Sequence, residues 1–270
     1  MSRPEFVAPP DVFYKDVEVD KYVRNNRMQQ IQAEMAGRAL ELLNLPEGAA
    51  NLHILDLGCG CGFSGRAIEE AGHAWTGLDI SHDMLRVARD GGESVVECDM
   101  GQYLPFRPGT FDGCISISAI QWLCQAYQKG QNPIQRLRML FESLFAVVKR
   151  SSRCVFQFYP ETQEQIDMIT NAALKAGFDG GLVVDFPNST KAKKFFIVLF
   201  AGKQPVPVAQ PAGEDRDVAR FSTKRVAAEK KPKKPKVKTR DWVLQKKQKQ
   251  REKGMAVRPD SKYTGRKRRH

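Results

Sequence analysis

The chain has 270 residues, of which 43 are Lys or Arg and 31 are Asp or Glu, and its hydrophobic content is 41%. This length allows one ordinary domain with an appendage, and the hydrophobic content suffices for a packed core. No apolar run approaches the roughly 20 residues of a membrane-spanning helix, and the N-terminus lacks the apolar segment of a signal peptide. We therefore expect a soluble, intracellular protein with no membrane partner.

The positive charge is confined to one end of the chain. Residues 221–270 hold 20 Lys and Arg against 4 Asp and Glu, a net charge of +16, whereas residues 1–220 carry −4. A segment of such low hydrophobicity and high charge cannot bury enough surface to offset its chain entropy. We expect a basic tail at 221–270 that is disordered alone, preceded by a Pro-rich linker at 202–220.

Strand-like and helix-like segments alternate through residues 51–201. The predicted strands lie at 52–57, 74–80, 94–100, 111–120, 153–159, 181–186 and 193–200. The predicted helices between them lie at 64–72, 82–90, 132–149 and 161–178. This alternation predicts an α/β fold with a mainly parallel sheet covered by helices on both faces. The turn between the last two strands is too short for a parallel crossover, so the last strand should be antiparallel.

A helical segment is expected at residues 1–50, ahead of the first strand. Within it, the pattern at 22–45 predicts one or two helices packed beside that strand.

The stretch HILDLGCGCGFSG, at 53–65, places a glycine-rich turn between a strand and a helix. Residues 60–65 match G-x-G-x-x-G, a pattern that brings bare backbone close to a ligand. Asp79 follows about 20 positions later, at the end of the second strand, where a carboxylate suits the hydroxyls of a ribose. On this motif alone, a dinucleotide and S-adenosylmethionine are both open.

Asp56 favours the second of these ligands, because it lies at the end of the first strand, directly before Leu57-Gly58. NAD would place a doubly negative pyrophosphate there, at a cost of roughly 3 kcal/mol per charge pair at about 5 Å and an effective dielectric of about 20. S-adenosylmethionine instead presents an ammonium and a sulfonium, which a carboxylate attracts.

The cysteines predict no metal site. Cys59 and Cys61 are the only two that lie close together in the sequence, and Cys-x-Cys is not the spacing that usually makes half a zinc site. We expect buried or loop thiols.

The stretches LDLGCGCG, GLDIS and CDM, at 55–62, 77–81 and 98–100, resemble the first three motifs of class I S-adenosylmethionine-dependent methyltransferases. The resemblance implies a Rossmann-like sheet of seven strands in the order 3-2-1-4-5-7-6, within a methyltransferase domain at 51–201. It places Asp79 on the ribose, Asp99 and Met100 beside the adenine, and the glycines against the methionine part.

The cofactor-binding residues expected from these considerations are Tyr22, Arg27, Asp56, Gly58, Gly60, Gly62, Asp79, Ile80, Asp99, Met100 and Ser116. Tyr22 and Arg27 are included because the methionine carboxylate needs a cation or donors. Two alternatives stay open: Asp99 as a helix cap, and Arg27 as a plain surface residue.

The stretch SISAIQWLCQA, at 116–126, bears on the methyl acceptor. It contains no evident general base, and no Asn/Asp-Pro-Pro-Tyr/Phe or Pro-Cys motif of amine or C5-pyrimidine methylation is present. Guanine N7 already carries a lone pair, so its methylation requires positioning rather than proton removal. Gln121 and Trp122 are the candidate guanine pocket; the alternative for Trp122 is a position in the core or facing a partner.

A wider resemblance extends from Pro4 to Arg269. It rests on RNNRMQQIQAEMAGRALELL, ISISAIQWLC, TRDWVLQKK and RPDSKYTGRKRR, which closely resemble the eukaryotic 18S rRNA (guanine-N7) methyltransferase family. The resemblance implies methylation of one guanine of 18S rRNA during small-subunit biogenesis. It also implies a small zinc-binding activator subunit, and location in the nucleolus and nucleoplasm, with the cytoplasm also open.

The tail and one sheet edge support two of these expectations. A tail of +16 neutralises phosphates and favours RNA binding, and KKPKKPK is typical of nuclear localisation. A helix at 241–253 could form on binding, with Asp241 as its N-cap and Trp242 among its apolar anchors. Val95 and Val96 would form an edge strand for the activator, unless an internal loop covers it.

Two other functions stay open: a methyltransferase for tRNA or protein, and an assembly factor of the small subunit whose binding role outweighs catalysis.

Overall fold

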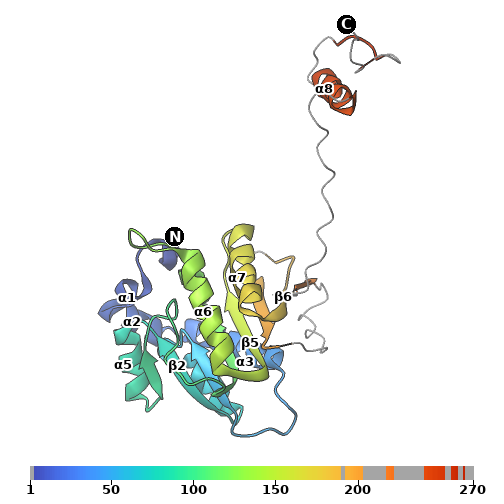
Figure 1. Ribbon diagram of the computed structural model, residues 1–270. Coiled ribbons are helices and arrows are strands. Elements are labelled where there is room, and N and C mark those ends of the chain that lie inside the picture. The colour runs from blue at the N-terminus through green and yellow to red at the C-terminus, as the bar shows by residue number, and fades with distance from the viewer. Residues whose placement is uncertain are drawn as a thin grey trace. The chain divides into compact units, whose positions relative to one another are not determined.

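The computed structural model describes residues 3–189, 192–202, 217–221, 240–252, 257–260 and 264. The chain forms two compact units, Met1–Thr223 and Lys224–His270, each described here by itself (Figure 1). Residues 203–216, in the predicted linker, and the basic run at 230–236 lie outside the described residues. No helix within the described ranges is long and apolar enough to cross a bilayer.

The first unit is built on one sheet, in the order β3-β2-β1-β4-β5-β7-β6-β8. The strands are β1 (His53–Leu57), β2 (Ala74–Asp79), β3 (Val95–Glu97), β4 (Phe111–Ile117), β5 (Val148–Phe158), β6 (Asp179–Asp185), β7 (Lys194–Phe200) and β8 (Asp217–Phe221). Strands β1 to β5 run parallel, and β7 is antiparallel to both β5 and β6. The predicted α/β fold, its seven-strand order and its antiparallel last strand are confirmed.

The eighth strand differs from the sequence prediction. β8 pairs antiparallel with β6, from Gly180↔Phe221 to Val184↔Asp217. The predicted linker at 202–220 therefore ends before Asp217. The segment has no sequence signal of its own because it is short and follows Pro-rich sequence. It forms because the outer edge of β6 offers unpaired backbone N–H and C=O groups.

The carboxyl ends of β1, β2 and β4 meet at one edge of the sheet. β1 is the turning point of the strand order, since β2 lies on one side of it and β4 on the other. The connections that follow β1 and β4 lead to opposite faces, through α4 (Phe63–Glu70) and α6 (Pro133–Val147). Ligands of open α/β sheets bind in the crevice at such a point.

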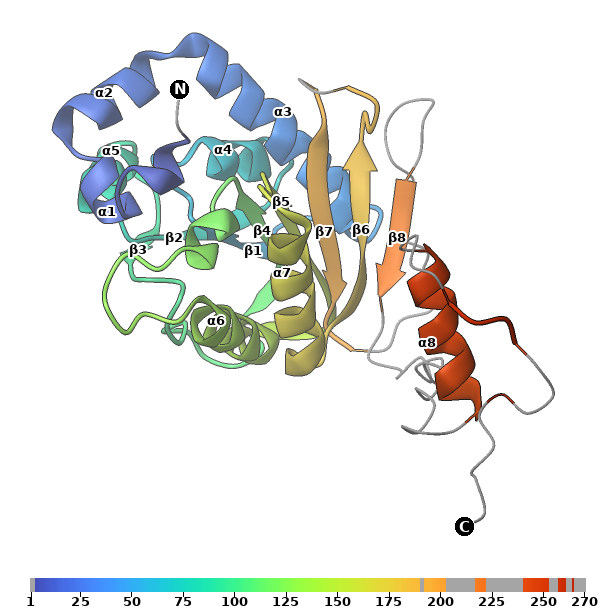
Figure 2. The same cartoon turned by 90° about the horizontal axis from the view of Figure 1, so that it is seen from above.

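Helices cover both faces, as the alternating pattern predicted. α3 (Asn26–Leu43), α4 and α5 (His82–Asp90) lie on one face, and α6 and α7 (Gln163–Ala176) lie on the other (Figure 2). Each face has its own buried cluster: Leu137, Leu140 and Phe141 of α6 belong to one, and Met35, Ile68 and Leu85 to the other. The helix ends differ from prediction by a few residues, most notably at α6, which stops where β5 begins.

The N-terminal segment holds more elements than its pattern predicted. α2 (Asp16–Arg24) and α3 are separated at Asn25, whose Oδ1 caps α3 by accepting from the Met28 backbone N at 3.1 Å. Ahead of them lie a 3-10 turn, η1 (Pro4–Phe6), and α1 (Pro10–Phe13). Elements of three or four residues are too short to show a hydrophobic period, so the sequence did not reveal them.

The second unit contains one described helix, α8 (Arg240–Glu252). Lys247 and Arg251, one turn apart, both pair with Asp260, at 2.9 Å and 2.8 Å. The sequence predicted this helix only on binding; the structure forms it within the chain alone. The side chain of the predicted cap, Asp241, and that of Trp242 are outside the described part of the helix.

Candidate cofactor and acceptor-base site

A cavity of about 410 Å³ lies at the carboxyl edge of the sheet. The predicted residues that line it are Tyr22, Gly58, Gly60, Asp79, Met100, Gln121 and Trp122. Those outside its lining are Arg27, Asp56, Gly62, Ile80, Asp99 and Ser116. We divide the lining into two parts, named after the expected methyl donor and methyl acceptor. The donor end is lined by Gly58, Gly60, Asp79, Met84 and Met100, and the acceptor end is lined by Arg3, Glu5, Gln121, Trp122 and Tyr159.

The glycines of the loop after β1 have different roles. All three have positive φ, but a Cβ at Gly58 would collide with Ala119, and one at Gly62 would meet Trp75 and Glu93. At Gly60 the nearest side-chain atom to such a Cβ is Met84 Cε, at 4.0 Å. Gly60 therefore leaves open space toward the cavity, whereas a Cβ at Gly62 would make ordinary contacts behind the loop, and glycine is favoured there by its φ of +87°.

Asp79 ends β2 and fixes the glycine loop. Its Oδ2 accepts from the Gly60 backbone N at 2.9 Å and its Oδ1 from the Ser81 backbone N at 2.8 Å. Burial raises the pKa of the Asp79 carboxyl, and the backbone N–H groups of Ser81, Gly60 and Ile80 act against that shift. Each oxygen keeps a further lone pair, so the carboxylate can still accept from ribose hydroxyls.

Asp56 is fully buried behind the loop. Ser64 Oγ donates to its Oδ2 at 2.5 Å, while Oδ1 has no hydrogen-bond partner. Burial raises the pKa of the carboxyl to about 7. An orphaned buried acceptor of this kind fits a ligand that brings positive N–H groups, and the ammonium of S-adenosylmethionine is such a ligand. The residues present therefore fit this cofactor.

Of three other predicted residues outside the lining, two have structural partners and the third is exposed. Asp99 pairs with Arg136 at 2.6 Å and accepts from the Gly101 backbone N at 2.8 Å, while its neighbour Met100 reaches the cavity. Ser116 is buried and donates to the Leu57 carbonyl at 2.7 Å, joining β4 to β1. Arg27 is exposed on α3.

Gln121 and Trp122 lie together on the 3-10 turn η2 (Ile120–Cys124), which follows β4. Trp122 is 5% exposed, with ring centroids of Phe13, Tyr14 and Tyr127 at 6.2, 5.9 and 6.4 Å. Gln121 is 6% exposed; its Nε2 donates to the Ser118 carbonyl at 2.8 Å, and its Oε1 has no partner.

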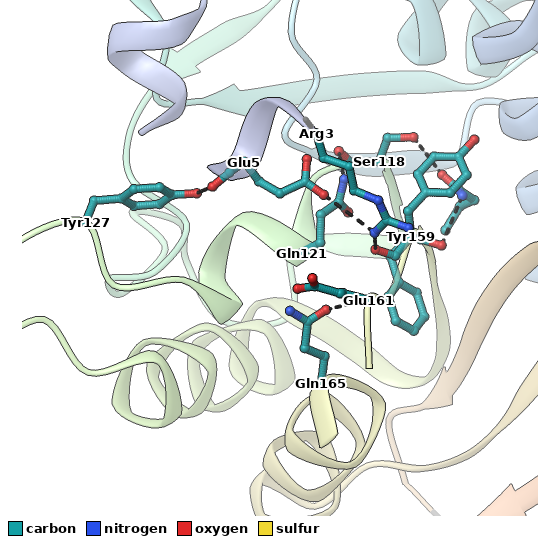
Figure 3. A network of polar contacts seen from close by, with 10 residues as sticks. Arg3, Glu5, Ser118, Gln121, Tyr127, Tyr159, Glu161 and Gln165 are labelled. Atoms are coloured by element: carbon teal, nitrogen blue, oxygen red, sulfur yellow. Dashed lines mark hydrogen bonds and ion pairs between the residues drawn. The ribbon is translucent and has the colours of Figure 1, made fainter. Parts of the chain in front are cut away.

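The N-terminal segment contributes lining residues that the sequence did not reveal, namely Arg3, Glu5 and Tyr14. Arg3 Nη1 donates to the Tyr159 carbonyl at 3.0 Å, and the Tyr127 hydroxyl donates to the Glu5 carbonyl at 2.9 Å (Figure 3). Ser81 Oγ donates to the Tyr14 carbonyl at 2.9 Å. These contacts join segments more than 60 residues apart, which a local pattern cannot show.

The tyrosines of the N-terminal segment are buried, which keeps their hydroxyl groups protonated. Burial raises the pKa of the Tyr14 hydroxyl to about 12 and that of Tyr22 further. The Tyr22 ring stacks on Phe63 with centroids 5.7 Å apart. The cavity is therefore walled by neutral aromatic rings, with cations at Arg3 and at Lys194, whose Nζ donates to the Tyr159 hydroxyl at 2.9 Å.

β3 lies at one end of the sheet order and pairs with β2, so the predicted edge position of Val95 and Val96 is confirmed. Both side chains are half-buried.

Comparison with known proteins identifies the family. A methyltransferase-domain model matches residues 54–137, and a model described as "Methyltransferase involved in Williams-Beuren syndrome" matches residues 199–270. A structure of magnesium protoporphyrin IX methyltransferase from Synechocystis, with bound S-adenosylmethionine, aligns with a TM-score of 0.53 at 16% identity, over 74% of this chain and 98% of that one; it shares the fold.

The similar curated proteins cover nearly the whole chain. The 18S rRNA (guanine-N(7))-methyltransferase of Mus musculus is 52% identical over 98% of this chain and 96% of its own length. The 18S rRNA (guanine(1575)-N(7))-methyltransferase of Saccharomyces cerevisiae is 45% identical over 100% and 99%. With a cavity suited to a cationic methyl donor and this likeness over both units, the chain belongs to the 18S rRNA (guanine-N7) methyltransferase family.

Proposed function

We propose that this protein transfers the methyl group of S-adenosylmethionine to N7 of a guanine in 18S rRNA during biogenesis of the small ribosomal subunit. The observation that carries the proposal is the cavity, which combines a donor end containing the Asp79 carboxylate with an acceptor end that includes the aromatic residues Trp122 and Tyr159. Among its lining residues there is no histidine or cysteine. Guanine N7 attacks with its own lone pair, so such a cavity is sufficient for the reaction.

The donor end orients the cofactor. When bound, S-adenosylmethionine supplies an electrophilic methyl group on a positively charged sulfur. Asp79 accepts from the ribose hydroxyls, while the free Oδ1 of Asp56 attracts the ammonium. Gly60 provides the space for close approach of the methionine part.

The acceptor end positions the base and excludes water. Trp122 offers a ring on which a purine stacks, and Tyr14 and Tyr22 close the wall beside it. Exclusion of water keeps the N7 lone pair free of competing hydrogen bonds, and confinement aligns it with the methyl group.

Complementation tests the proposal. Cells lacking their own enzyme receive this chain or its Asp79→Lys variant, and their 18S rRNA is cleaved chemically at N7-methylguanine. We expect cleavage at one guanine with the wild type and none with the variant. Absence of cleavage with the wild type, together with methylated tRNA or protein, would support another substrate. Restoration of small-subunit production by Asp79→Lys would make assembly the dominant role.

We propose that the outer edge of β3 binds a small zinc-binding activator subunit. The Ser94 carbonyl and the Cys98 backbone N both bond to β2, so Val95 and Glu97, which alternate with them, direct their backbone groups outward. An added strand would satisfy these groups and cover the half-buried valines.

A matched pair of variants tests this edge. Glu97→Pro removes an outward N–H, whereas Glu97→Thr removes the same carboxylate and keeps the N–H. Copurification of a small zinc protein should be lost with the first and retained with the second. Equal recovery with both would contradict the proposal.

The second unit is proposed to hold the precursor rRNA and to direct the protein to the nucleolus and nucleoplasm, because residues 221–270 carry a net charge of +16. Deletion of 224–270 should weaken binding to precursor particles, more at low salt than at high salt, and leave donor affinity unchanged. If donor affinity falls equally, the two units do not act separately.

A further inference from the structure

The acceptor end of the cavity contains a buried oxygen, Gln121 Oε1, that accepts no hydrogen bond from the protein. Gln121 Nε2 donates to the Ser118 carbonyl at 2.8 Å, which fixes the orientation of the amide. Its Oε1 is then left without a partner, although the residue is only 6% exposed. A buried acceptor without a partner destabilises the protein, so a ligand that donates a hydrogen bond to it is favoured.

Glu5 places a carboxylate in the same part of the cavity. The residue is 5% exposed, and Figure 3 shows its carboxylate turned toward Gln121 and Arg3. Arg3 Nη1 forms an ion pair with Glu5 Oε1 at 3.8 Å, a separation longer than a hydrogen bond. The backbone is held by the Tyr127 hydroxyl on the Glu5 carbonyl and by Arg3 on the Tyr159 carbonyl. The carboxylate is therefore positioned by other groups and available to a ligand.

Two hydrogen-bond acceptors and one adjacent hydrogen-bond donor in the cavity match one edge of guanine. Guanine presents N1–H and the N2 amino group as donors beside the O6 acceptor, whereas adenine presents one amino group beside an unprotonated N1. Glu5 and Gln121 supply acceptors, and the Arg3 guanidinium beside Glu5 supplies a donor. N7 lies on the opposite side of the purine from N1 and N2, so binding of this edge leaves N7 free.

We propose that Glu5 is a specificity-determining residue that accepts from N1–H and N2–H of the target guanine. Gln121 Oε1 accepts the remaining N2 hydrogen, Arg3 donates to O6, and Trp122 stacks on the ring. This inference rests on the proposed N7 methylation of guanine and names the contacts that select the base.

Inosine monophosphate isolates the N2 contact, because its base lacks only the 2-amino group of guanine. The full chain, saturated with S-adenosylhomocysteine, is titrated with guanosine or inosine monophosphate in competition NMR. We expect the wild type to prefer the guanine nucleotide by about tenfold or more, since a hydrogen bond to a charged group is worth about 1.5–3 kcal/mol. Glu5→Gln should lower guanine affinity about tenfold and remove most of the preference.

Glu161→Gln is the matched control, because Glu161 is an exposed acid near the same end of the sheet but outside the cavity lining (Figure 3). It should retain the full preference. The inference is overturned if wild type binds both nucleotides equally, or if Glu5→Gln and Glu161→Gln behave alike. The affinity for S-adenosylmethionine, measured in parallel, should be the same for the wild type and both variants. Equal affinities exclude a general loss of structure.

The 18S rRNA assay separates this inference from the proposed function. Guanine N7 methylation by the wild type, with no nucleotide preference, would overturn the role of Glu5 and leave the proposed function in place. No N7 methylation by the wild type would overturn both. Methylation at a hydroxyl or amine instead of N7 would also overturn both, since the inference rests on methylation at guanine N7.

Discussion

The two ends of the cavity are built in different ways. The donor end comes mostly from one contiguous β-α-β stretch, in which Asp79 holds the Gly60 backbone N and Asp56 lies behind the loop. The acceptor end combines η1, η2 and the end of β5, through bonds such as Arg3 to the Tyr159 carbonyl. The donor end can hold a cofactor that is common to many methyltransferases, whereas the acceptor end can differ between enzymes that methylate different substrates. The comparison implies that substitutions at the two ends should have separable effects.

The largest effect is expected from Asp79→Lys. The variant loses two acceptor oxygens and places a cation beside a cationic ligand, so donor affinity should fall about 100-fold or more. Isothermal calorimetry measures it, with Asp90→Lys, an exposed site with the same charge change, as the control. Unchanged affinity in Asp79→Lys would contradict the ribose assignment.

Gly60→Ala tests the donor end, and Gly48→Ala, outside the cavity lining, is its matched control. Both glycines have positive φ, +55° and +72°, and neither has a close obstacle to a Cβ. Each substitution should therefore cost a similar free energy of unfolding, about 1 kcal/mol, in urea titrations. Only Gly60→Ala should lower donor affinity, by about tenfold, because its Cβ enters the space of the ligand. Equal donor affinities would show that the ligand does not approach Gly60.

Trp122→Leu tests the independence of the acceptor end. Loss of a stacking surface should lower kcat/KM for rRNA methylation by about tenfold, since base stacking is worth about 1–3 kcal/mol. Trp122→Phe should retain most of the activity, and donor affinity should be unchanged in both variants. A parallel loss of donor affinity would mean that the two ends do not act separately.

The smallest effect on the affinity for S-adenosylmethionine is expected from pH, through Asp56, which also makes the stability of the protein depend on pH. Its pKa is raised by burial from 3.8 to about 7, so the folded state retains a proton that the unfolded chain releases. The resulting stabilisation is complete below pH 3.8 and is lost as pH rises toward 7. The free energy of unfolding of the ligand-free wild type should fall over that range relative to Asp56→Asn.

The same group should link donor binding to pH. A cationic ligand favours the ionised carboxylate, so donor affinity should rise severalfold from pH 6 to pH 8, with proton release in calorimetry. Asp56→Asn should lack this dependence. A pH-independent affinity in the wild type would place the ammonium away from Asp56.

The strands and the donor end were predictable because their determinants are local, whereas the strand order was expected from the family resemblance. Alternation identified the strands of the seven-strand sheet, the spacing of the glycines and Asp79 indicated a nucleoside ligand, and the charge of Asp56 favoured a cationic one. Three of the predicted cofactor-binding residues outside the cavity lining have other partners or are exposed, and their roles stay predictions. Asp99 pairs with Arg136, Ser116 bonds to the Leu57 carbonyl, and Arg27 is exposed.

The amino-acid sequence by itself determined the α/β class, the glycine loop, the charge sign of its ligand and the basic second unit, since each depends on neighbours in the chain. Only the tertiary structure decided the pairing of β8 with β6 and the position of Glu5 beside Gln121. Glu5 and Gln121 are separated by more than 100 residues, and the segment around Glu5 has no period that marks its role. Contacts of that kind form only when the folded sheet brings distant segments to one edge.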